Sequence, residues 1–468
     1  MVSIWKPSLS PSHAPIYLAL AEALANDIGT GALRPGERLP THRALARQLG
    51  LNIGTVSRAY AEAESRGLIN GEVGRGSFVR HATAQPNFAR SDSAASAPVH
   101  DLAINVPAGG PSAAERSSAL RALADRADLA DCFDTYHPAG LPRHREAGVH
   151  WLERSGVEPS AERVLITGGA QHAMAVALAA LSNAGDGVMA ESLTYPGLKS
   201  LASLLRLRTH AVAMDEHGIL PDALEAVAKK TRARLLYLMP NLHNPTGVIL
   251  PLDRRQAVAE IAQRHELLIV EDDSHGFLLP KDAALPPLAA LAPERTLFIE
   301  SLSKSVSAGL RVAYLLAPRA NPDLMPRLIG ANNAIAWMGA PLMCELAALW
   351  IQDGTALRIA RAKRTEITAR QLLSRRVLEQ PKTPSAATSS TLWLELPDPW
   401  RADEFVVNCR QRGVAVSPPD AFAVLRANVP HAVRLCIGTP ATREELSAAL
   451  DVLASVLHAG PGAKAALI

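Results

Sequence analysis

The sequence has few cysteines and few aromatic residues. Its 468 residues include four cysteines, and aromatic residues make up 4% of the chain. The cysteines lie far apart and none forms a Cys-x-x-Cys motif: they are Cys132, Cys344, Cys409 and Cys436. This spacing argues against a disulfide framework and against a structural zinc site. Reduced thiols in a cytoplasmic protein fit the pattern best.

The sequence also lacks a long hydrophobic run. No apolar stretch reaches the roughly 18 residues that a membrane-spanning helix requires. The N-terminal region is interrupted by Pro7, Pro11 and Pro15 and then becomes amphipathic and acidic, which is not typical of a signal peptide. Hydrophobic residues make up 48% of the chain and charged residues 20%, an ordinary balance for a globular protein with a large core. The length predicts roughly two to four domains.

The net charge is small, and its excess is confined to one end of the chain. The formal charge is +3; residues 1–80 contain nine Lys and Arg but six Asp and Glu, whereas the rest contains 39 of each sign. A basic surplus at the N-terminal end suits contact with nucleic acid, although a surplus this small does not prove it.

Three short amphipathic segments occupy the first 66 residues. The hydrophobic spacing predicts helices over residues 15–27, 42–49 and 54–66. Thr41 and Asn52 are placed to cap the second and third helices, and Gly50 is placed to end the second. Two short helices joined by such a turn form a helix-turn-helix.

The residues after the third helix have the pattern of a β-hairpin. Residues 67–79 alternate in character around a turn at Gly74-Arg75-Gly76. Together with the connector Arg34-Pro-Gly-Glu-Arg-Leu-Pro40, this order of elements resembles the winged helix-turn-helix of the GntR family of regulators. The resemblance implies that the third helix enters the major groove of DNA and that the wing tip reaches the minor groove.

The same resemblance assigns residues to DNA contacts. It implies contacts by Arg43, Thr55 and Arg75, with Ser57 and Arg58 as weaker candidates. Ile53 stands where the family often has an arginine, so one base or phosphate contact is expected to be missing. The alternative is a small protein-binding domain whose charges are merely solvated.

A linker and a larger α/β region are predicted next. Residues 81–100 are poor in large apolar residues and have no periodicity, which indicates a flexible linker. Beyond them, strand-like apolar runs alternate with helical patterns, which predicts a mostly parallel sheet covered by helices. The runs are residues 164–167, 188–190, 235–239, 267–270, 297–299 and 312–316.

Unusual residues follow these strands, at the edge of the sheet where ligands bind in such folds. Gly168-Gly-Ala-Gln171 opens a long helix, and the free N–H groups of Ala170 and Gln171 could hold a phosphate, although a tight turn needs glycine anyway. Tyr195 could stack on a flat cofactor or simply pack.

The next two strand ends carry an amide and a carboxylate. The backbone of Asn244 is restricted by Pro245, so its amide could donate to a phenolate oxygen. Asp272 could pair with a protonated ring nitrogen. The adjacent acids around Asp272 could instead chelate a metal, but no His/Asp cluster supports this, so no metal site is predicted.

The most informative stretch is Ser301-Leu-Ser-Lys-Ser-Val-Ser-Ala-Gly-Leu-Arg311. Small neighbours can desolvate Lys304, which lowers its pKa and frees the amine to attack a carbonyl. The hydroxyls of Ser301 and Ser303, with Arg311, suit a phosphate group. Pyridoxal 5′-phosphate (PLP) requires both a Schiff-base lysine and a phosphate cradle. Taken alone, the stretch could equally be a basic surface loop.

The whole series of motifs resembles the fold-type-I aminotransferase superfamily. The order of glycine turn, tyrosine, Asn-Pro-Thr-Gly, strand-end aspartate, Ser-x-Ser-Lys and Gly-x-Arg is complete. The resemblance implies that Lys304 forms the internal aldimine with PLP, that Asp272 holds the pyridine nitrogen and that Asn244 contacts O3′. It implies stacking by Tyr195 and assigns the phosphate to Ala170, Gln171, Ser301, Ser303 and Arg311.

Three further residues enter through the same resemblance. Tyr136 is similar to the tyrosine that reaches the phosphate in the neighbouring subunit, and Arg434 to the arginine that grips a substrate α-carboxylate. His275 stands where the superfamily usually has a tyrosine that hydrogen-bonds O3′. The charge of a histidine is expected to depend on pH near neutrality, which puts efficient transamination in question.

The two halves together resemble the MocR family of bacterial transcription regulators. The predicted organisation is a winged helix-turn-helix over residues 14–80, a linker over 81–100 and a PLP-binding aminotransferase-like domain over 101–468. The large part of that domain ends at about 320, and a small C-terminal α+β part covers about 321–457. The resemblance implies a homodimer with PLP at the subunit interface.

The function implied is regulation of DNA binding by a small molecule. PLP, or an amine or amino acid that condenses with it, would bind one conformation better than another and so shift the affinity for operator DNA. The alternative is a catalytically active aminotransferase with an accessory DNA-binding domain.

Overall fold

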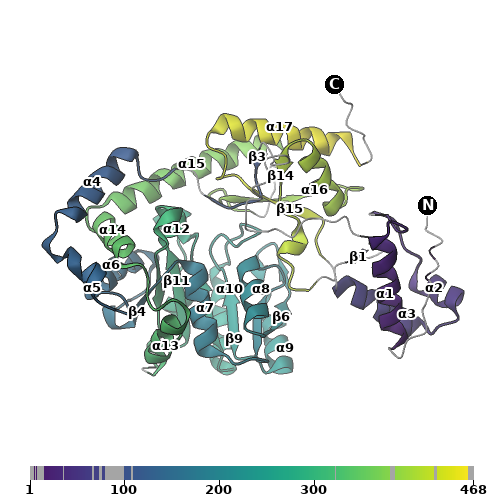
Figure 1. The fold of residues 1–468 in the computed structure, drawn as a ribbon, viewed down its shortest axis with the longest axis horizontal. Coiled ribbons are helices and arrows are strands. Elements are labelled where there is room, and N and C mark those ends of the chain that lie inside the picture. The colour runs from purple at the N-terminus through teal and green to yellow at the C-terminus, as the bar shows by residue number, and fades with distance from the viewer. Residues whose placement is uncertain are drawn as a thin grey trace. The chain divides into compact units, whose positions relative to one another are not determined.

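The structure is a computed structural model of the chain (Figure 1). It describes residues 5, 7, 15–34, 36–65, 68–72, 76–79, 100–106, 109–321, 323–379, 385–425 and 429–461. Nearly all of the predicted linker, and the predicted wing tip with Arg75, lie outside the described residues.

The N-terminal part contains the predicted winged helix-turn-helix elements. Its elements are α1 (Ile16–Gly29), α2 (His42–Leu49), α3 (Ile53–Ser65), β1 (Ile69–Glu72) and β2 (Gly76–Val79). The side chain of Thr41 accepts a hydrogen bond from the Ala44 amide, and Gly50 takes the left-handed conformation that ends α2. The strands β1 and β2 pair antiparallel. The three predicted helices and the hairpin are therefore confirmed.

The helices of this part enclose a small apolar core. Leu20 and Leu24 of α1 pack with Leu45 of α2 and with Val56 and Tyr60 of α3. The spacing of these residues follows the helical period, so each helix turns its polar face outward. The exposed faces of α2 and α3 are the ones that the sequence assigns to DNA.

The larger part is built on a seven-stranded sheet with the strand order β4-β12-β11-β10-β9-β5-β6. Only β12 runs antiparallel to its neighbours β4 and β11, and the other strand pairs are parallel. The strands are β4 (Val164–Thr167), β5 (Gly187–Glu191), β6 (Arg208–Val212), β9 (Leu235–Leu238), β10 (Leu268–Asp272), β11 (Thr296–Ser301) and β12 (Ala313–Leu316).

The six predicted strands are confirmed, each within two residues at either end. The sequence missed β6, which begins with the polar residues Arg208-Thr-His210 and is exposed or half-buried over most of its length. An edge strand of this kind lacks the continuous apolar run that marks a strand buried on both faces. The prediction of a mostly parallel sheet is also confirmed.

Helices cover both faces of the sheet (Figure 1). The first group comprises α6 (Pro142–Leu152), α9 (Pro221–Thr231), α10 (Leu252–Arg264), α11 (Leu288–Leu291) and α14 (Pro341–Gln352), which pack on the face that carries Leu236, Ile269 and Phe298. The second group covers the opposite face and comprises α7 (Ala170–Leu181), α8 (Pro196–Leu204) and α13 (Leu324–Ala336). The switch between faces follows the right-handed crossover rule, because the chain steps toward β6 and then back.

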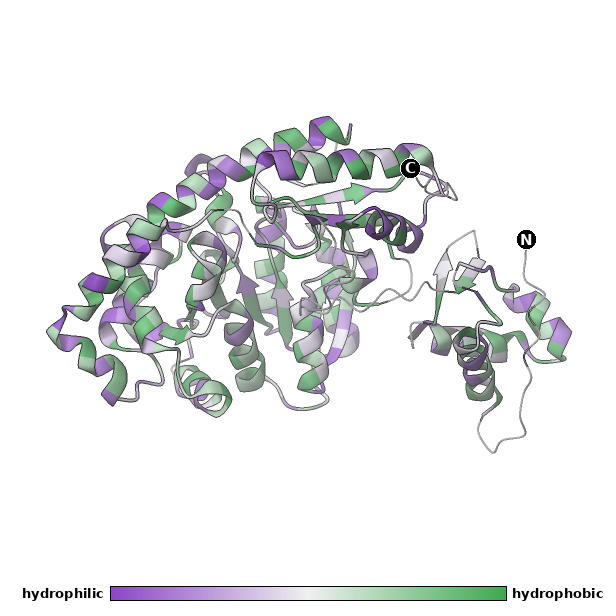
Figure 2. Cartoon of the chain, turned by 45° about the horizontal axis from the view of Figure 1, so that its top comes forward, coloured by the Kyte–Doolittle hydropathy of each residue, from purple (hydrophilic) through white to green (hydrophobic). Residues whose placement is uncertain are grey.

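The remaining elements are shorter or lie away from the sheet. The helices are α4 (Ala113–Ala124), α5 (Asp131–Asp134), α12 (Leu302–Ser305), α15 (Thr355–Val377), α16 (Ala402–Gln411) and α17 (Arg443–Ala459), and the strands are β3 (His100–Asp101), β7 (Met214–Asp215), β8 (Gly218–Ile219), β13 (Thr391–Glu395), β14 (Val414–Ala415) and β15 (Ala432–Cys436). The residues of α15 are a mixture of polar and apolar types (Figure 2), and its buried residues recur every three or four positions, so that one face of the helix is buried. No helix among the described residues is long and apolar enough to cross a membrane.

Candidate functional site

The carboxyl ends of the parallel strands bring the predicted residues to one edge of the sheet. Tyr195 follows β5, Asn244 follows β9, Asp272 ends β10 and Ser301 ends β11. The sequence placed these residues at successive strand ends, and the strand order makes the four strands neighbours. Such an edge is where open α/β sheets bind their ligands.

Lys304 lies on the short helix α12, and its amine donates to the main-chain carbonyl of Asn105. Burial, together with the positive charges of Arg434 and Arg311, lowers the pKa of Lys304 to about 8. At pH 7 roughly a tenth of such amines are neutral, compared with far fewer for an ordinary lysine. The lysine therefore has the property that carbonyl condensation requires.

Asp272 is held by three hydrogen bonds. The Ser274 hydroxyl and amide donate to Oδ1 at 2.5 and 3.0 Å, and the Tyr237 hydroxyl donates to Oδ2 at 2.9 Å. Burial raises the pKa of Asp272, and these donors oppose the rise because they stabilise the carboxylate. The result is a fixed carboxylate that suits a protonated ring nitrogen.

The two acids beside Asp272 do not share its site. Glu271 accepts from the amides of Leu288 and Ala289 at 3.1 and 2.8 Å, and Asp273 accepts from the Asn241 amide at 2.9 Å. Successive residues of a strand point to opposite faces, so both neighbours point away from Asp272. Burial raises the pKa of Glu271 to about 7. The three acids do not converge in the way that metal chelation would require.

Asn244 and Arg434 contact each other. Nη1 of Arg434, on β15, donates to Oδ1 of Asn244 at 2.9 Å, and Nη2 donates to the carbonyl of Ala103. Because the amide oxygen of Asn244 accepts this bond, its Nδ2 group is left as the donor. Both residues are buried. This is the orientation that donation to a phenolate oxygen requires.

A second cluster forms at the start of α7. Gly169 precedes the helix with φ of 98°, and no side chain caps the helix. Arg311 donates from Nη1 to the Ser303 hydroxyl and from Nη2 to the Gly168 carbonyl, both at 3.0 Å. A Cβ atom at Gly169 would lie 2.5 Å from the Arg311 guanidinium, so only glycine fits here. Free helix N–H groups beside an arginine form an anion site.

Two predicted phosphate ligands have other partners in the structure. The Ser301 hydroxyl accepts from the Ser303 amide at 3.2 Å, which caps α12, and donates to the Val312 carbonyl at 3.3 Å. The side chain of Gln171 donates to the Gly197 carbonyl at 3.2 Å, whereas the group predicted to hold the phosphate is its main-chain N–H. Their phosphate roles remain predictions, as does that of Ala170 at the first position of α7.

Tyr195 packs closely over a glycine. A Cβ atom at Gly197 would lie 2.3 Å from the Tyr195 ring and 2.2 Å from the Gln171 amide oxygen. Burial raises the pKa of the Tyr195 hydroxyl. The contact fixes the ring beside the start of α7, and its stacking on a cofactor remains a prediction.

The expected pH dependence of His275 near neutrality is wrong. His275 is 4% exposed. Burial, assisted by the positive charges of Lys304 and Arg434, lowers its pKa to about 3. The imidazole is therefore neutral throughout the physiological range, because burial and the neighbouring positive charges both disfavour its protonated form.

Tyr136 lies apart from this cluster within the chain. It is 75% exposed, and its ring centroid is 5.6 Å from that of Trp337 in a tilted arrangement. An exposed tyrosine can reach a neighbouring subunit, which is the role that the sequence predicts for it.

The DNA-contact candidates have different surroundings. Arg43 on α2 and Arg58 on α3 are exposed, and Thr55 is half-buried. The Ser57 hydroxyl is 3.0 Å from His42 Nδ1, so it is already hydrogen-bonded within the domain. Ile53 is 48% exposed at the start of α3. The loss of a DNA contact at this position remains a prediction.

Three contributors to the site were missed by sequence reasoning. Tyr237 is inside an apolar strand run and reads as core; Ala103 and Asn105 contribute main-chain carbonyls from a segment without a motif. Main-chain acceptors leave no trace in side-chain patterns. Tyr237, as a hydroxyl within a buried strand, was the one detectable signal.

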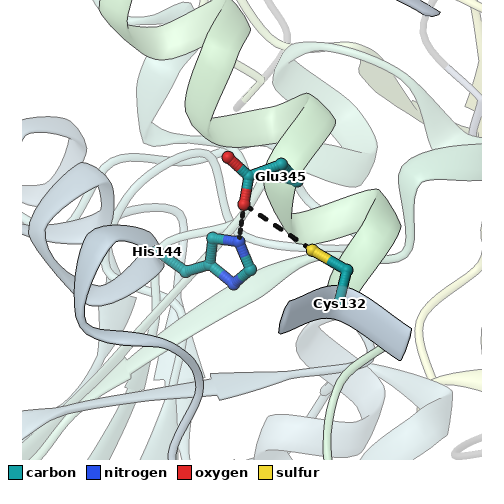
Figure 3. A group of neighbouring side chains, drawn as sticks. All are labelled: Cys132, His144 and Glu345. Atoms are coloured by element: carbon teal, nitrogen blue, oxygen red, sulfur yellow. Dashed lines mark hydrogen bonds and ion pairs between the residues drawn. The ribbon is translucent and has the colours of Figure 1, made fainter. Parts of the chain in front are cut away.

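Cys132, His144 and Glu345 form a group with metal-ligand chemistry, shown in Figure 3. Glu345 accepts from His144 Nε2 at 2.6 Å and from Arg143 Nε at 2.7 Å, and Arg126 Nη1 lies 2.6 Å from its other oxygen. Burial raises the pKa of the Cys132 thiol, which disfavours the thiolate form. Two guanidinium groups already neutralise the carboxylate, so we interpret the group as an ion-pair network.

Glu345→Ala should lower the free energy of unfolding by about 3 kcal/mol, because it leaves two half-buried guanidinium groups and the buried His144 without their carboxylate. Burial favours the protonated form of Glu345, but hydrogen bonds from His144 and Arg143 prevail and hold its pKa at about 2. This contribution is therefore present above the ordinary value of 4.5 and is lost as the pH falls toward 2. Urea unfolding at pH 7 and pH 3 measures it. The exposed Glu153 is the control, and a chelator that lowered the stability would contradict the assignment.

Comparisons with known proteins agree with this geometry. Residues 97–452 match the family described as aminotransferase class I and II, and residues 16–79 match the bacterial regulatory proteins of the gntR family. The HTH-type transcriptional regulator YdeF of Bacillus subtilis is 33% identical over 97% of this chain and 96% of its own length.

Two further relatives are similar over most of the chain. The HTH-type pyridoxine biosynthesis transcriptional regulator PdxR of Corynebacterium glutamicum is 29% identical over 69% of this chain and 71% of its own. The crystal structure of LysN, an α-aminoadipate aminotransferase of Thermus thermophilus, has a TM-score of 0.67 and 27% identity; the alignment covers 76% of this chain and 92% of LysN.

Proposed function

Because the chain belongs to the MocR-type regulators, in which a gntR-family domain precedes a class I and II aminotransferase domain, we propose that it binds PLP at Lys304 and senses an amine or amino acid there. The chain is a DNA-binding transcriptional regulator of the GntR type. The family of its larger domain depends on PLP. The operator DNA of a bacterial regulator lies in the cytoplasm, where we expect the protein to act.

The observation that carries the proposal is the joint placement of Lys304 and Asp272. An amine of lowered pKa and a fixed carboxylate lie in one buried cluster, close enough for each charge to affect the pKa of the other group. A ligand lysine and a ring-nitrogen partner are the two groups that PLP requires of a protein. A basic surface loop, the alternative interpretation of the Ser301–Arg311 stretch, would need neither a buried amine nor a fixed carboxylate.

The other residues also fit the cofactor. The start of α7 with Arg311 offers donors for a phosphate, and Nδ2 of Asn244 is left as a donor because its Oδ1 accepts from Arg434. Nδ1 of His275 is buried without a partner among the described residues. When bound, PLP supplies an aldehyde for amines and an electron sink. Arg434 would orient a ligand carboxylate by a bidentate pair, and Tyr195 would hold the ring plane.

We propose that the regulator is a homodimer. The α/β part exposes the large apolar side chains of Phe133, Tyr136 and Trp337, which are 68%, 75% and 62% exposed. Aromatic side chains exposed together are typical of protein interfaces. Tyr136 would then reach the phosphate in the partner subunit.

The route to the DNA-binding domain is proposed to begin at residues 102–106. The carbonyls of Ala103 and Asn105 accept from Arg434 and Lys304, and the Ile104 carbonyl accepts from the Thr439 hydroxyl. Lys304 and Arg434 must leave these carbonyls to bind the cofactor and a ligand carboxylate. The segment follows the linker in sequence, so its release would alter the tether of the winged helix and the affinity for DNA.

Thr439→Val should weaken this coupling. The change keeps the shape but removes the hydrogen bond to Ile104, so residues 102–106 are held less firmly before the cofactor binds. We expect the ratio of DNA affinities with and without PLP to fall by about threefold, the order of one hydrogen bond. Gel-shift titrations measure this ratio. Thr439→Ser, which keeps the hydroxyl, should behave as the wild type, and an unchanged ratio in the valine variant would refute the route.

The test of the function combines absorbance with DNA binding. PLP is added to the purified protein, then a panel of amines and amino acids, while visible absorbance, keto-acid release and affinity for selected DNA fragments are followed. A spectral change with one amine, no turnover and a shift in DNA affinity supports the sensor. Steady keto-acid release without any effect on DNA would identify an aminotransferase instead.

A further inference from the structure

His275 has two ring nitrogens in different surroundings. Nε2 is 3.1 Å from Nδ2 of Asn105. Nδ1 is buried and has no hydrogen-bond partner among the residues that the structure describes. A buried polar atom without a partner costs free energy unless a ligand satisfies it. Lys304 contacts the carbonyl of the same Asn105, so the ring lies close to the cofactor lysine.

The contacts of Asn105 determine which ring nitrogen carries the proton. Its Oδ1 accepts a hydrogen bond from the Ser390 hydroxyl at 3.4 Å, which leaves Nδ2 toward the imidazole. An amide NH₂ group only donates, so Nε2 must accept and the proton resides on Nδ1. The charged and titratable groups around the ring are Lys304, Arg434 and His243, and all disfavour a second proton.

We propose that Asn105 is a positioning residue that fixes His275 as the neutral form protonated at Nδ1, so that the ring donates a hydrogen bond to the phenolate oxygen of the cofactor. The inference rests on the proposed function and deepens it. It explains how a histidine replaces the tyrosine expected at this position. A neutral imidazole held in one tautomer is a constant donor, whereas a freely titrating histidine would change its charge near neutrality.

The inference predicts a specific effect of Asn105→Asp. A carboxylate at this position only accepts, so it would move the proton to Nε2 and turn Nδ1 into an acceptor beside the phenolate. We expect PLP to bind about tenfold more weakly, as loss of one hydrogen bond and a new repulsion would produce. His275→Tyr in the same background supplies a hydroxyl donor of its own. We expect it to restore the affinity to within about threefold.

Two measurements decide the matter. Nitrogen NMR of the wild-type protein with ¹⁵N-labelled histidine reports the tautomer directly, and absorbance titration with PLP reports the affinity of each variant. A proton on Nε2 in the wild type overturns the inference, and so does a double variant as weak as Asn105→Asp, which would indicate a merely structural role. If the wild-type protein does not bind PLP at all, the proposed function fails as well. Normal wild-type binding with unaffected Asn105 variants would sink this inference alone.

Discussion

Lys304→Ala will abolish covalent cofactor binding and the response of DNA affinity to PLP and amines. The amine of Lys304 lies in the buried cluster with Asp272 and Arg434, and its pKa of about 8 makes it reactive near neutrality. An allosteric coupling of the usual size, about 5–150-fold in affinity, would disappear. DNA binding itself should persist, because the winged helix has its own core. Borohydride reduction followed by peptide mapping measures the covalent label, and gel shifts measure the coupling.

A second lysine provides the control for this experiment. Lys363 on α15 is 3% exposed, and its amine donates to the main-chain carbonyl of Lys304 at 3.0 Å. Burial, followed by the charge of Lys304, lowers the pKa of Lys363 to about 8 as well. Lys363→Met should keep the label on Lys304. A label that survives in Lys304→Ala, or maps to Lys363, would show that Lys304 is not the residue that binds PLP.

The double change of Arg43→Ala and Arg75→Ala should weaken DNA binding by roughly 100-fold, since contacts of this kind contribute about 1–3 kcal/mol each. Arg43 is exposed on α2, and the cap at Thr41 keeps this helix intact in the variant. The dependence of binding on salt should also become shallower, because fewer counterions are released. Gel-shift titrations at several salt concentrations measure both quantities.

Adding an arginine to the winged helix should have the opposite effect on DNA binding. Ile53→Arg places a guanidinium where the family often has one, at a position that is 48% exposed. We expect tighter DNA binding. The slope of log affinity against log salt concentration should steepen by about 1, as one added phosphate contact would produce. Arg264→Ala, an exposed arginine on α10, should alter neither. Equal losses in Arg264→Ala and in the double variant would mean that the winged helix carries no specific contact.

The sequence determined the elements whose signals are local. The spacing of apolar residues with Thr41 and Gly50 fixed α2 to the residue, and continuous apolar runs located six strands of the sheet. The strand-end positions of Tyr195, Asn244 and Asp272 also followed from local order, since parallel strands end at one edge. These features depend on neighbours along the chain, and the sequence contains them in full.

Tertiary structure decided the features that depend on distant residues. The order of the strands, the reversed direction of β12 and the existence of β6 required pairing partners that no local pattern names. The pKa of His275 depends on burial and on charges from Lys304 and Arg434, which are far away in sequence. Ser301 caps a helix, and Asn105 enters the site through its backbone. Residue type reveals which chemistry is possible, and only the fold decides which partners each group finds.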